Sequence, residues 1–228
     1  MTKITVISGF GQEPDTFKNV FSNKDVIALD YLETKNFEDL LTRDLKTYDN
    51  EVVIGWSLGG QVAIRLIEKQ ILKPKLLILI ATPFQFVEDD KNEVGMPLEL
   101  FNQFQNFLDE NPAQALAYLG HLASLGDKNP EDVLKNMVAI ENTINLGFYF
   151  LNSWLKELKD FNCFNVDFKN FPKTVYICGD GDAVVNSKQY TYFNEKLGDF
   201  EMKLIFSCGH APHFSHKNEF LNIINEKI

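Results

Sequence analysis

The stretch that decides the fold spans residues 51–60 and reads EVVIGWSLGG. It starts as a short apolar run typical of a buried strand, and it leads into residues 60–69, which have the apolar spacing of an amphipathic helix. Between strand and helix, Gly55, Ser57 and Gly59 form a G-x-S-x-G pattern. Glycine permits a turn so tight that side chains would clash. The pattern therefore predicts a serine exposed where a strand turns sharply into a helix.

Similar apolar runs recur along the chain and are separated by helix-like stretches. The runs lie at residues 3–7, 25–29, 51–54, 75–80, 174–178 and 202–206. Helical spacing lies between several of them, as in residues 36–46 and 60–69. Strands that alternate with helices favour a parallel sheet covered on both faces. We therefore predict an α/β fold with a mostly parallel sheet of about six strands flanked by helices.

The alternation stops in residues 87–170, which have helical spacing throughout. Asn-Pro pairs at residues 111–112 and 129–130 supply an N-cap followed by proline at the first helical position. We expect a helical lid insertion over residues 87–170. It would divide one core into a first part, residues 1–86, and a second part, residues 171–228.

This insertion is both apolar and acidic. Its apolar residues, Phe104 and Phe148 among them, give each helix one apolar face. These faces either pack on one another and on the sheet or line an apolar channel above a site. The insertion has 14 acidic and 6 basic residues, so it accounts for −8 of the formal net charge of −10.

The overall composition restricts the partners of the protein. With 228 residues, 45% of them hydrophobic and 24% charged, the chain is typical of a globular protein with one sizeable core. Its negative charge would repel nucleic acid, and only Arg43 and Arg65 could form bidentate arginine clamps. No apolar run approaches the length that crosses a membrane, and the N-terminal residues lack a signal-peptide pattern. We expect a cytoplasmic monomer that binds neither nucleic acid nor membrane.

A serine hydroxyl needs a base, and three of the four histidines lie just after the last strand, in residues 208–216, CGHAPHFSH. His210 directly follows the strand end and a glycine, so it is the preferred base, with His213 as second choice. His216 suits the start of the C-terminal helix. The spacing of the three could suggest a metal cluster, but Pro212 interrupts a helix and no acidic or cysteine ligand has matching spacing. We expect neither a metal nor a cofactor.

The carboxylate that orients the base is expected after the penultimate strand, in the sequence GDGDAVV of residues 179–185. Asp182 is preferred because it lies beyond the turn, from which it can reach a histidine on the neighbouring loop. Asp180 is the alternative, although we expect it to bond the backbone of its own turn. The cysteines, Cys163, Cys178 and Cys208, are odd in number and lie in or beside apolar runs, so buried free thiols are expected.

A serine that attacks a carbonyl carbon also needs two N–H donors for the oxyanion of the tetrahedral intermediate. The residue after the nucleophile, Leu58, offers one of them. The second is expected from the loop after the first strand, residues 8–11, where the N–H of Phe10 is the candidate. The simpler interpretation of that loop is a tight turn without further function.

At these residues the sequence resembles the α/β-hydrolases. Residues 55–60, GWSLGG, resemble their nucleophile elbow, and residues 210–216, HAPHFSH, resemble the histidine loop of the pimeloyl-acyl-carrier-protein methyl ester esterases of biotin synthesis. The resemblance implies a triad of Ser57, Asp182 and His210. It also implies that Trp56 lines the acyl pocket.

The resemblance further implies a cofactor-free serine ester hydrolase whose substrate is a small acyl ester, possibly attached to acyl carrier protein. In that family the acidic carrier docks on a basic lid that contains arginine, whereas residues 87–170 contain no arginine here. Three alternatives remain open. The first is a general carboxylesterase or thioesterase, and the second is another reaction on the same triad, such as carbon–carbon bond hydrolysis or an elimination. The third is a non-catalytic ligand-binding member of the same superfamily.

Overall fold

The computed structural model describes residues 2–137 and 148–228, and the predicted parallel sheet lies at its centre. The strands are β1 (Lys3–Ile7), β2 (Asp25–Leu29), β3 (Val52–Trp56), β4 (Leu76–Ile80), β5 (Lys173–Gly179) and β6 (Phe200–Ile205). Among the described residues they form one six-stranded sheet in the order β2-β1-β3-β4-β5-β6, and every neighbouring pair is parallel. The predicted α/β fold is confirmed.

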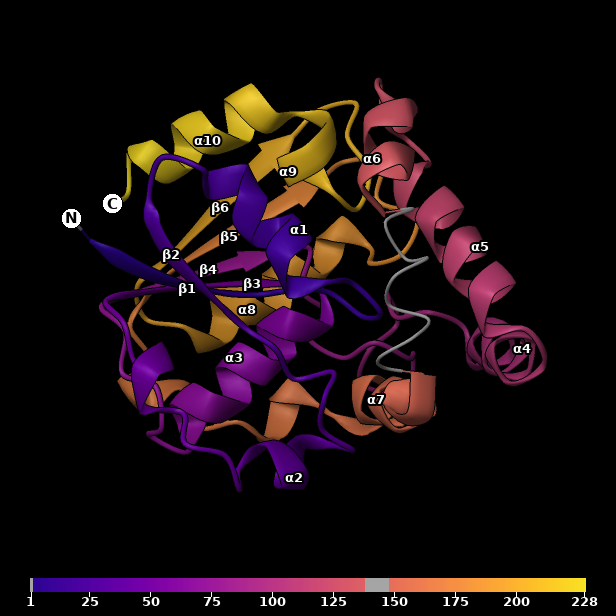
Figure 1. Cartoon of the computed structure of the whole chain (residues 1–228), viewed down its shortest axis with the longest axis horizontal. Coiled ribbons are helices and arrows are strands. Elements are labelled where there is room, and N and C mark those ends of the chain that lie inside the picture. Colours follow the sequence, from indigo (N-terminus) through magenta and orange to yellow (C-terminus); the bar gives the residue numbers. More distant parts are fainter. Residues whose placement is uncertain (1, 138–147) are drawn as a thin grey trace.

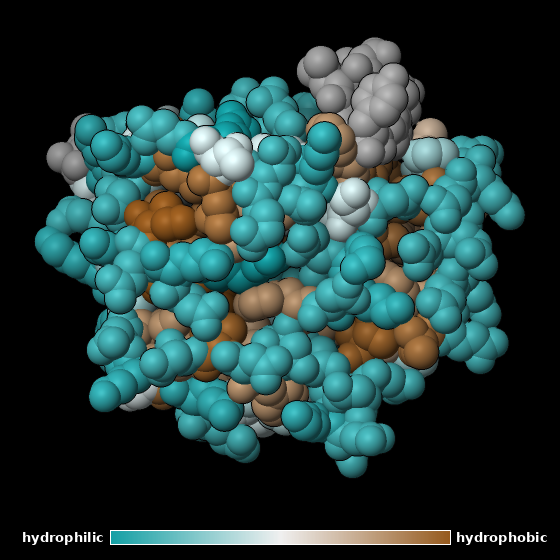
Figure 2. All heavy atoms as spheres, turned by 90° about the horizontal axis from the view of Figure 1, so that it is seen from below, coloured by the Kyte–Doolittle hydropathy of each residue, from teal (hydrophilic) through white to brown (hydrophobic). Residues whose placement is uncertain are grey.

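Helices cover both faces of this sheet (Figure 1). One face carries α1 (Pro14–Lys18), α9 (Pro212–Ser215) and α10 (Lys217–Asn225), and the other carries α3 (Leu58–Glu68) and α8 (Tyr190–Lys196). Because both faces are covered, every residue of the central strands β3 and β4 is buried. On the molecular face in Figure 2 the surface is mainly hydrophilic, and apolar atoms appear in hollows between polar side chains.

The helical insertion follows β4 and precedes β5. It contains α4 (Leu98–Glu110), α5 (Pro112–Ser124), α6 (Pro130–Met137) and α7 (Phe148–Asp160). Asn111 caps α5 as expected, since its side chain accepts a hydrogen bond from the N–H of Gln114 at 3.2 Å. An ion pair of 2.5 Å between Arg65 of α3 and Glu157 of α7 ties the insertion to the core. None of the helices in the described part of the chain is long and apolar enough to cross a bilayer.

One helix is much shorter than the sequence predicts. The spacing in residues 36–46 predicts a single helix, but α2 covers only Phe37–Leu40, and a separate 3-10 turn follows at Lys46–Tyr48. Residues 41–45 include the buried Leu45, so burial is not what ends the helix. Arg43 donates to the backbone oxygen of Asp30 at 2.8 Å, and Oδ1 of Asp44 accepts the N–H of Lys46 at 3.1 Å. A short side chain that bonds nearby backbone in this way competes with helix continuation. The expectation for the thiols is confirmed, because all three cysteines are buried and free.

Candidate active site

Ser57 lies on a strained turn between β3 and α3. Its backbone has φ 54° and ψ −123°, a conformation that side chains rarely adopt. The turn is tied to the sheet because the Ser57 N–H donates to the oxygen of Ile80 at 2.8 Å. A Cβ on Gly55 would lie 2.5 Å from the Cα of Gly60, and one on Gly59 would lie 2.2 Å from the oxygen of Ile7. Both glycines are therefore required by close backbone contact, as the pattern predicts.

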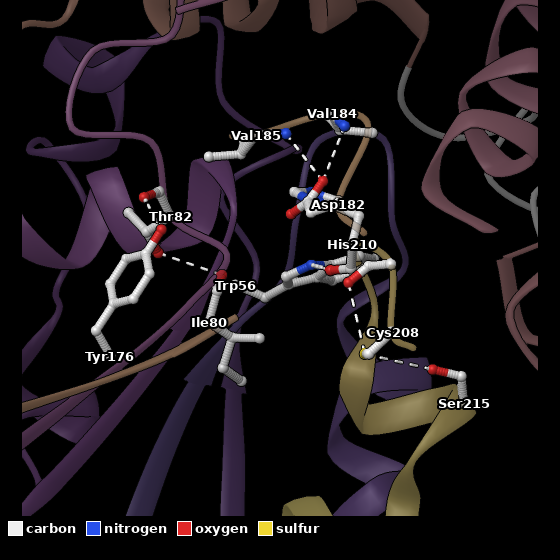
Figure 3. Close-up of polar contacts among 11 residues, drawn as sticks. Trp56, Ile80, Thr82, Tyr176, Asp182, Val184, Val185, Cys208, His210 and Ser215 are labelled. Atoms are coloured by element: carbon white, nitrogen blue, oxygen red, sulfur yellow. Dashed lines mark hydrogen bonds and ion pairs between the residues drawn. The ribbon is translucent and has the colours of Figure 1, made fainter. Parts of the chain in front are cut away.

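His210 is paired with Asp182. The Nδ1 atom of His210 lies 2.8 Å from Oδ2 of Asp182, and both side chains are almost fully buried. The other carboxylate oxygen, Oδ1, accepts the N–H groups of Val184 at 2.8 Å and Val185 at 2.9 Å (Figure 3). Because the carboxylate accepts, Nδ1 is the protonated ring nitrogen. This leaves Nε2 of His210 as the nitrogen available to take a proton from a nucleophile.

The backbone of His210 is held by two contacts from distant parts of the chain. Its N–H donates to the oxygen of Ala123, at the end of α5 in the helical insertion, at 3.0 Å. Its carbonyl oxygen accepts from Nε1 of Trp56, the residue before Ser57, at 3.0 Å. Sequence reasoning missed both contacts, since nothing in the local pattern links these segments. The nucleophile strand and the insertion thus position the histidine together.

Asp180 and His213, the alternatives to Asp182 and His210, make other contacts. The Oδ1 atom of Asp180 accepts from the N–H of Cys208 at 3.3 Å. The carboxylate that bonds its own turn is therefore Asp182 rather than Asp180, contrary to expectation.

His213 is fully buried against the rings of Trp56 and Phe17, at centroid distances of 4.5 and 4.9 Å. Neither ring nitrogen of His213 has a hydrogen-bond partner among the described residues. Burial, together with the nearby charge of His210, lowers the pKa of His213 well below its usual value.

Ser57 and His210 open into one cavity of about 350 Å³ below the helical insertion. The described residues that line it include no aspartate, glutamate, lysine or arginine. Most of the lining comes from the insertion and is apolar: Met96, Leu100, Phe104, Phe107, Leu119, Leu122, Met137, Leu155 and Leu158. The apolar faces of the insertion thus serve both expected purposes, since they pack together and also bound a channel above Ser57.

Several residues with expected roles can be placed around this cavity. Trp56, Phe104 and Phe10 line it. Leu58 is the first residue of α3, where a backbone N–H has no acceptor within the helix. Phe148 begins α7, but its side chain lies outside the described residues. A Cβ on Gly9 would lie 3.1 Å from the ring of Trp56, so glycine lets the Phe10 loop approach the nucleophile strand closely.

Comparisons with known proteins agree with this architecture. The sequence profile described as "Alpha/beta hydrolase family" matches residues 8–223. A pimeloyl-[acyl-carrier protein] methyl ester esterase of Wigglesworthia glossinidia brevipalpis is 28% identical over 210 residues, which are 88% of this chain and 77% of the relative. The same-named protein of Aromatoleum aromaticum is 27% identical over 187 residues, covering 79% of this chain and 74% of the relative.

A longer relative and two solved structures complete the comparison. The biotin biosynthesis bifunctional protein BioHC of Teredinibacter turnerae is 29% identical over 189 residues, which are 77% of this chain but only 32% of that protein. An esterase from Exiguobacterium antarcticum and a bromoperoxidase from Bacillus anthracis both superpose with a TM-score of 0.86 at 13% identity. Each superposition covers 99% of this chain and 91% of the other. At that identity the likeness concerns the fold.

Proposed function

Since the chain belongs to the alpha/beta hydrolase family, we propose that it hydrolyses carboxylic esters through an acyl-enzyme on Ser57. The observation that carries the proposal is the His210–Asp182 pair, whose histidine lines the same apolar cavity as a serine on a strained turn. A histidine oriented by a carboxylate is the group that activates a serine hydroxyl. The cavity supplies the water-poor space in which an ester can meet that hydroxyl.

In the first half of the reaction, Oγ of Ser57 attacks the ester carbonyl carbon while Nε2 of His210 accepts the hydroxyl proton. The bond to Asp182 keeps Nδ1 protonated and stabilises the imidazolium that forms. The carbonyl oxygen becomes an oxyanion, for which the N–H groups of Leu58 and Phe10 are the proposed donors. Collapse of the intermediate breaks the bond to the alcohol, and the imidazolium returns its proton to the departing oxygen.

In the second half, water attacks the acyl group on Ser57, and His210 again accepts a proton and passes it to the Ser57 oxygen. The products are the free acid and the alcohol, and the enzyme returns to its starting state. Every proton transfer uses the same imidazole nitrogen, so the Asp182 bond serves both halves. No cofactor is required by these steps.

The cavity and the relatives point to the class of acyl group. A lining without charged side chains in its described part suits a neutral acyl chain better than one that ends in a free carboxylate. The relatives named pimeloyl-[acyl-carrier protein] methyl ester esterase support a methyl ester at the reacting end. We therefore propose a medium-length acyl methyl ester as substrate, with carrier-bound pimeloyl methyl ester as its most specific form.

The charge of the helical insertion favours a second candidate, a carboxylesterase that acts on carrier-free esters. Residues 87–170 have a net charge of −8, and an acidic carrier protein would be repelled by an acidic surface near the cavity. The two candidates share the chemistry at Ser57. They differ only in whether the acyl chain arrives on a protein.

One experiment separates the two candidates. A biotin auxotroph that lacks its methyl esterase is complemented with this chain or with Ser57→Ala, and purified protein is assayed on the dimethyl ester of pimelate. Growth with the parent and not with the variant supports the carrier-bound substrate. Hydrolysis of the free diester without growth, despite good expression, supports the carboxylesterase. Absence of both activities in folded protein contradicts ester hydrolysis.

A further inference from the structure

A second group of reactive side chains lies at the two ends of the histidine loop, beside Asp127, and does not line the Ser57 cavity. The carboxylate of Asp127, the thiol of Cys208 and the imidazole of His216 place one ligand atom each within 4.8 Å of one another. Asp127 comes from the connection between α5 and α6, Cys208 follows β6, and His216 immediately precedes α10. The fold thus brings together an aspartate of the insertion and two residues of the core that sequence spacing could not connect.

Asp127 is the unusual member of this group. Its side chain is 0% exposed, and neither carboxylate oxygen makes a hydrogen bond of ordinary geometry with a described residue. A buried carboxylate is costly unless hydrogen bonds or a cation compensate its charge. The one ion-pair contact that Asp127 makes with a described residue is to the imidazole of His216.

The imidazole of His216 does not compensate the Asp127 carboxylate through a hydrogen bond. Its Nδ1 lies 3.6 Å from Oδ1 of Asp127, too far for a hydrogen bond, and its closer partner is the Ser215 hydroxyl at 3.0 Å. In a tetrahedral zinc site, bonds of about 2.0–2.3 Å place neighbouring ligand atoms about 3.3–3.7 Å apart. The 3.6 Å between Nδ1 of His216 and Oδ1 of Asp127 falls within this range of ligand-atom separations. Sγ of Cys208 lies within 4.8 Å of the ligand atoms of both other residues.

We propose that Asp127, Cys208 and His216 form a binding site for a divalent cation of the zinc type. The ion takes one carboxylate oxygen, one thiolate sulfur and one imidazole nitrogen, and water completes the tetrahedron. Binding displaces the thiol proton of Cys208 to solvent. The charge of the ion is then balanced by one carboxylate and one thiolate, so the buried site as a whole is neutral.

The surroundings support this assignment in two ways. First, a surface hollow lined by Asp132, Lys217, Glu219 and other residues reaches His216, whose side chain is 12% exposed, so this ligand is accessible from solvent. Second, the segments that carry the ligands are already aligned by backbone contacts. The N–H of Lys128 donates to the oxygen of Ser207 at 2.8 Å. A bound ion would fasten the helical insertion to the loop that carries His210.

Cobalt(II) provides a direct probe, because a tetrahedral site with thiolate ligation gives a sulfur-to-metal charge-transfer band and visible ligand-field bands. The full-length protein is stripped with a chelator and titrated with cobalt(II). We expect saturation at one equivalent, loss of the bands when zinc is added, and a higher Tm for the zinc-loaded protein. Asp127→Asn and Cys208→Ser should lose the charge-transfer band. Cys163→Ser removes a buried thiol outside the cluster and should keep it.

Two results would overturn the proposal. One is the absence of a charge-transfer band in the parent protein at excess cobalt(II). The other is an unchanged band in Asp127→Asn with a circular dichroism spectrum like that of the parent, because the carboxylate would then not be a ligand. If Cys208→Ser does not fold, His216→Gln takes its place, with the same expected loss. Ser57→Ala should bind cobalt(II) as the parent does, so this test is independent of the proposed esterase activity.

Discussion

The nucleophile turn and the histidine loop meet at one cavity, but they are held in place in different ways. Ser57 is positioned by its immediate neighbours in sequence, since Gly55 and Gly59 allow the close backbone contacts that the turn requires. His210 is positioned by residues far away in sequence, among them Ala123 of the insertion and Asp182. The turn at Ser57 is therefore encoded locally, whereas the position of His210 depends on the assembly of the whole fold.

The largest effect is expected at the locally encoded residue. Ser57→Ala removes the nucleophile and should lower kcat for ester hydrolysis by about 10⁶-fold while leaving the fold intact. Steady-state assays on a short p-nitrophenyl ester measure this change. Ser22→Ala, an exposed serine far from the cavity, is the control and should behave as the parent. Equal activity of Ser57→Ala and the parent would contradict the assignment.

Asp182 belongs to the part of the site that depends on distant segments. Asp182→Asn should lower kcat by roughly 10⁴-fold, because an amide no longer holds the imidazole in the required tautomer. The matched control is Asp180→Asn, two residues away, whose carboxylate bonds to Cys208 N–H and not to His210. We expect a far smaller loss in the control, measured by the same assay. A larger loss in Asp180→Asn would reverse the roles of the two carboxylates.

These two carboxylates also show how far sequence reasoning reaches. The strands, the turn at Ser57 and the pairing partners His210 and Asp182 follow from local patterns: apolar runs, a glycine motif and positions after strand ends. The contacts of His210 with Ala123 and Trp56 do not, because they join segments whose spacing carries no signal. A similar limit applies to Asp127, whose neighbours come from other segments. The helix expected over residues 36–46 is wrong for a different reason, since periodicity alone does not show local polar contacts such as that of Asp44 with the Lys46 N–H.

The turn at Ser57 depends on close backbone contact at its glycines, so a side chain at one of them should lower the stability of the fold. Gly59→Ala places a Cβ 2.2 Å from the backbone oxygen of Ile7, where no flexible side chain can give way. We expect the free energy of unfolding to fall by about 3 kcal/mol, as measured by urea denaturation. Gly198→Ala is the control, because nothing lies within 4 Å of the added Cβ, and its effect should stay within about 0.5 kcal/mol. Equal effects in both variants would show that the contact at Gly59 is not limiting.

The smallest effect concerns His213, the buried histidine of the histidine loop that packs against Trp56 and Phe17. Burial lowers its pKa from the usual 6.5, so the folded protein keeps it neutral while the unfolded chain takes up a proton as the pH falls below 6.5. The unfolded state then binds more protons, and stability declines. Between pH 7.5 and 5.5 the parent should lose about 1 kcal/mol more than His213→Phe.

Urea denaturation at the two pH values measures this difference, in the presence of a chelator. His121→Gln changes an exposed histidine and should retain the pH dependence of the parent. If His213→Phe lost as much stability as the parent on acidification, His213 would not be the group responsible.

Covalent labelling with a fluorophosphonate tests whether the His210–Asp182 pair activates Ser57, as proposed. A passive ligand-binding protein needs no activated hydroxyl, whereas an esterase reacts with the probe. Mass spectrometry of the folded protein should show one adduct on Ser57, and labelling should be strongly slowed in His210→Gln and abolished in Ser57→Ala. No adduct in the folded parent, or an adduct on another residue, would contradict the claim.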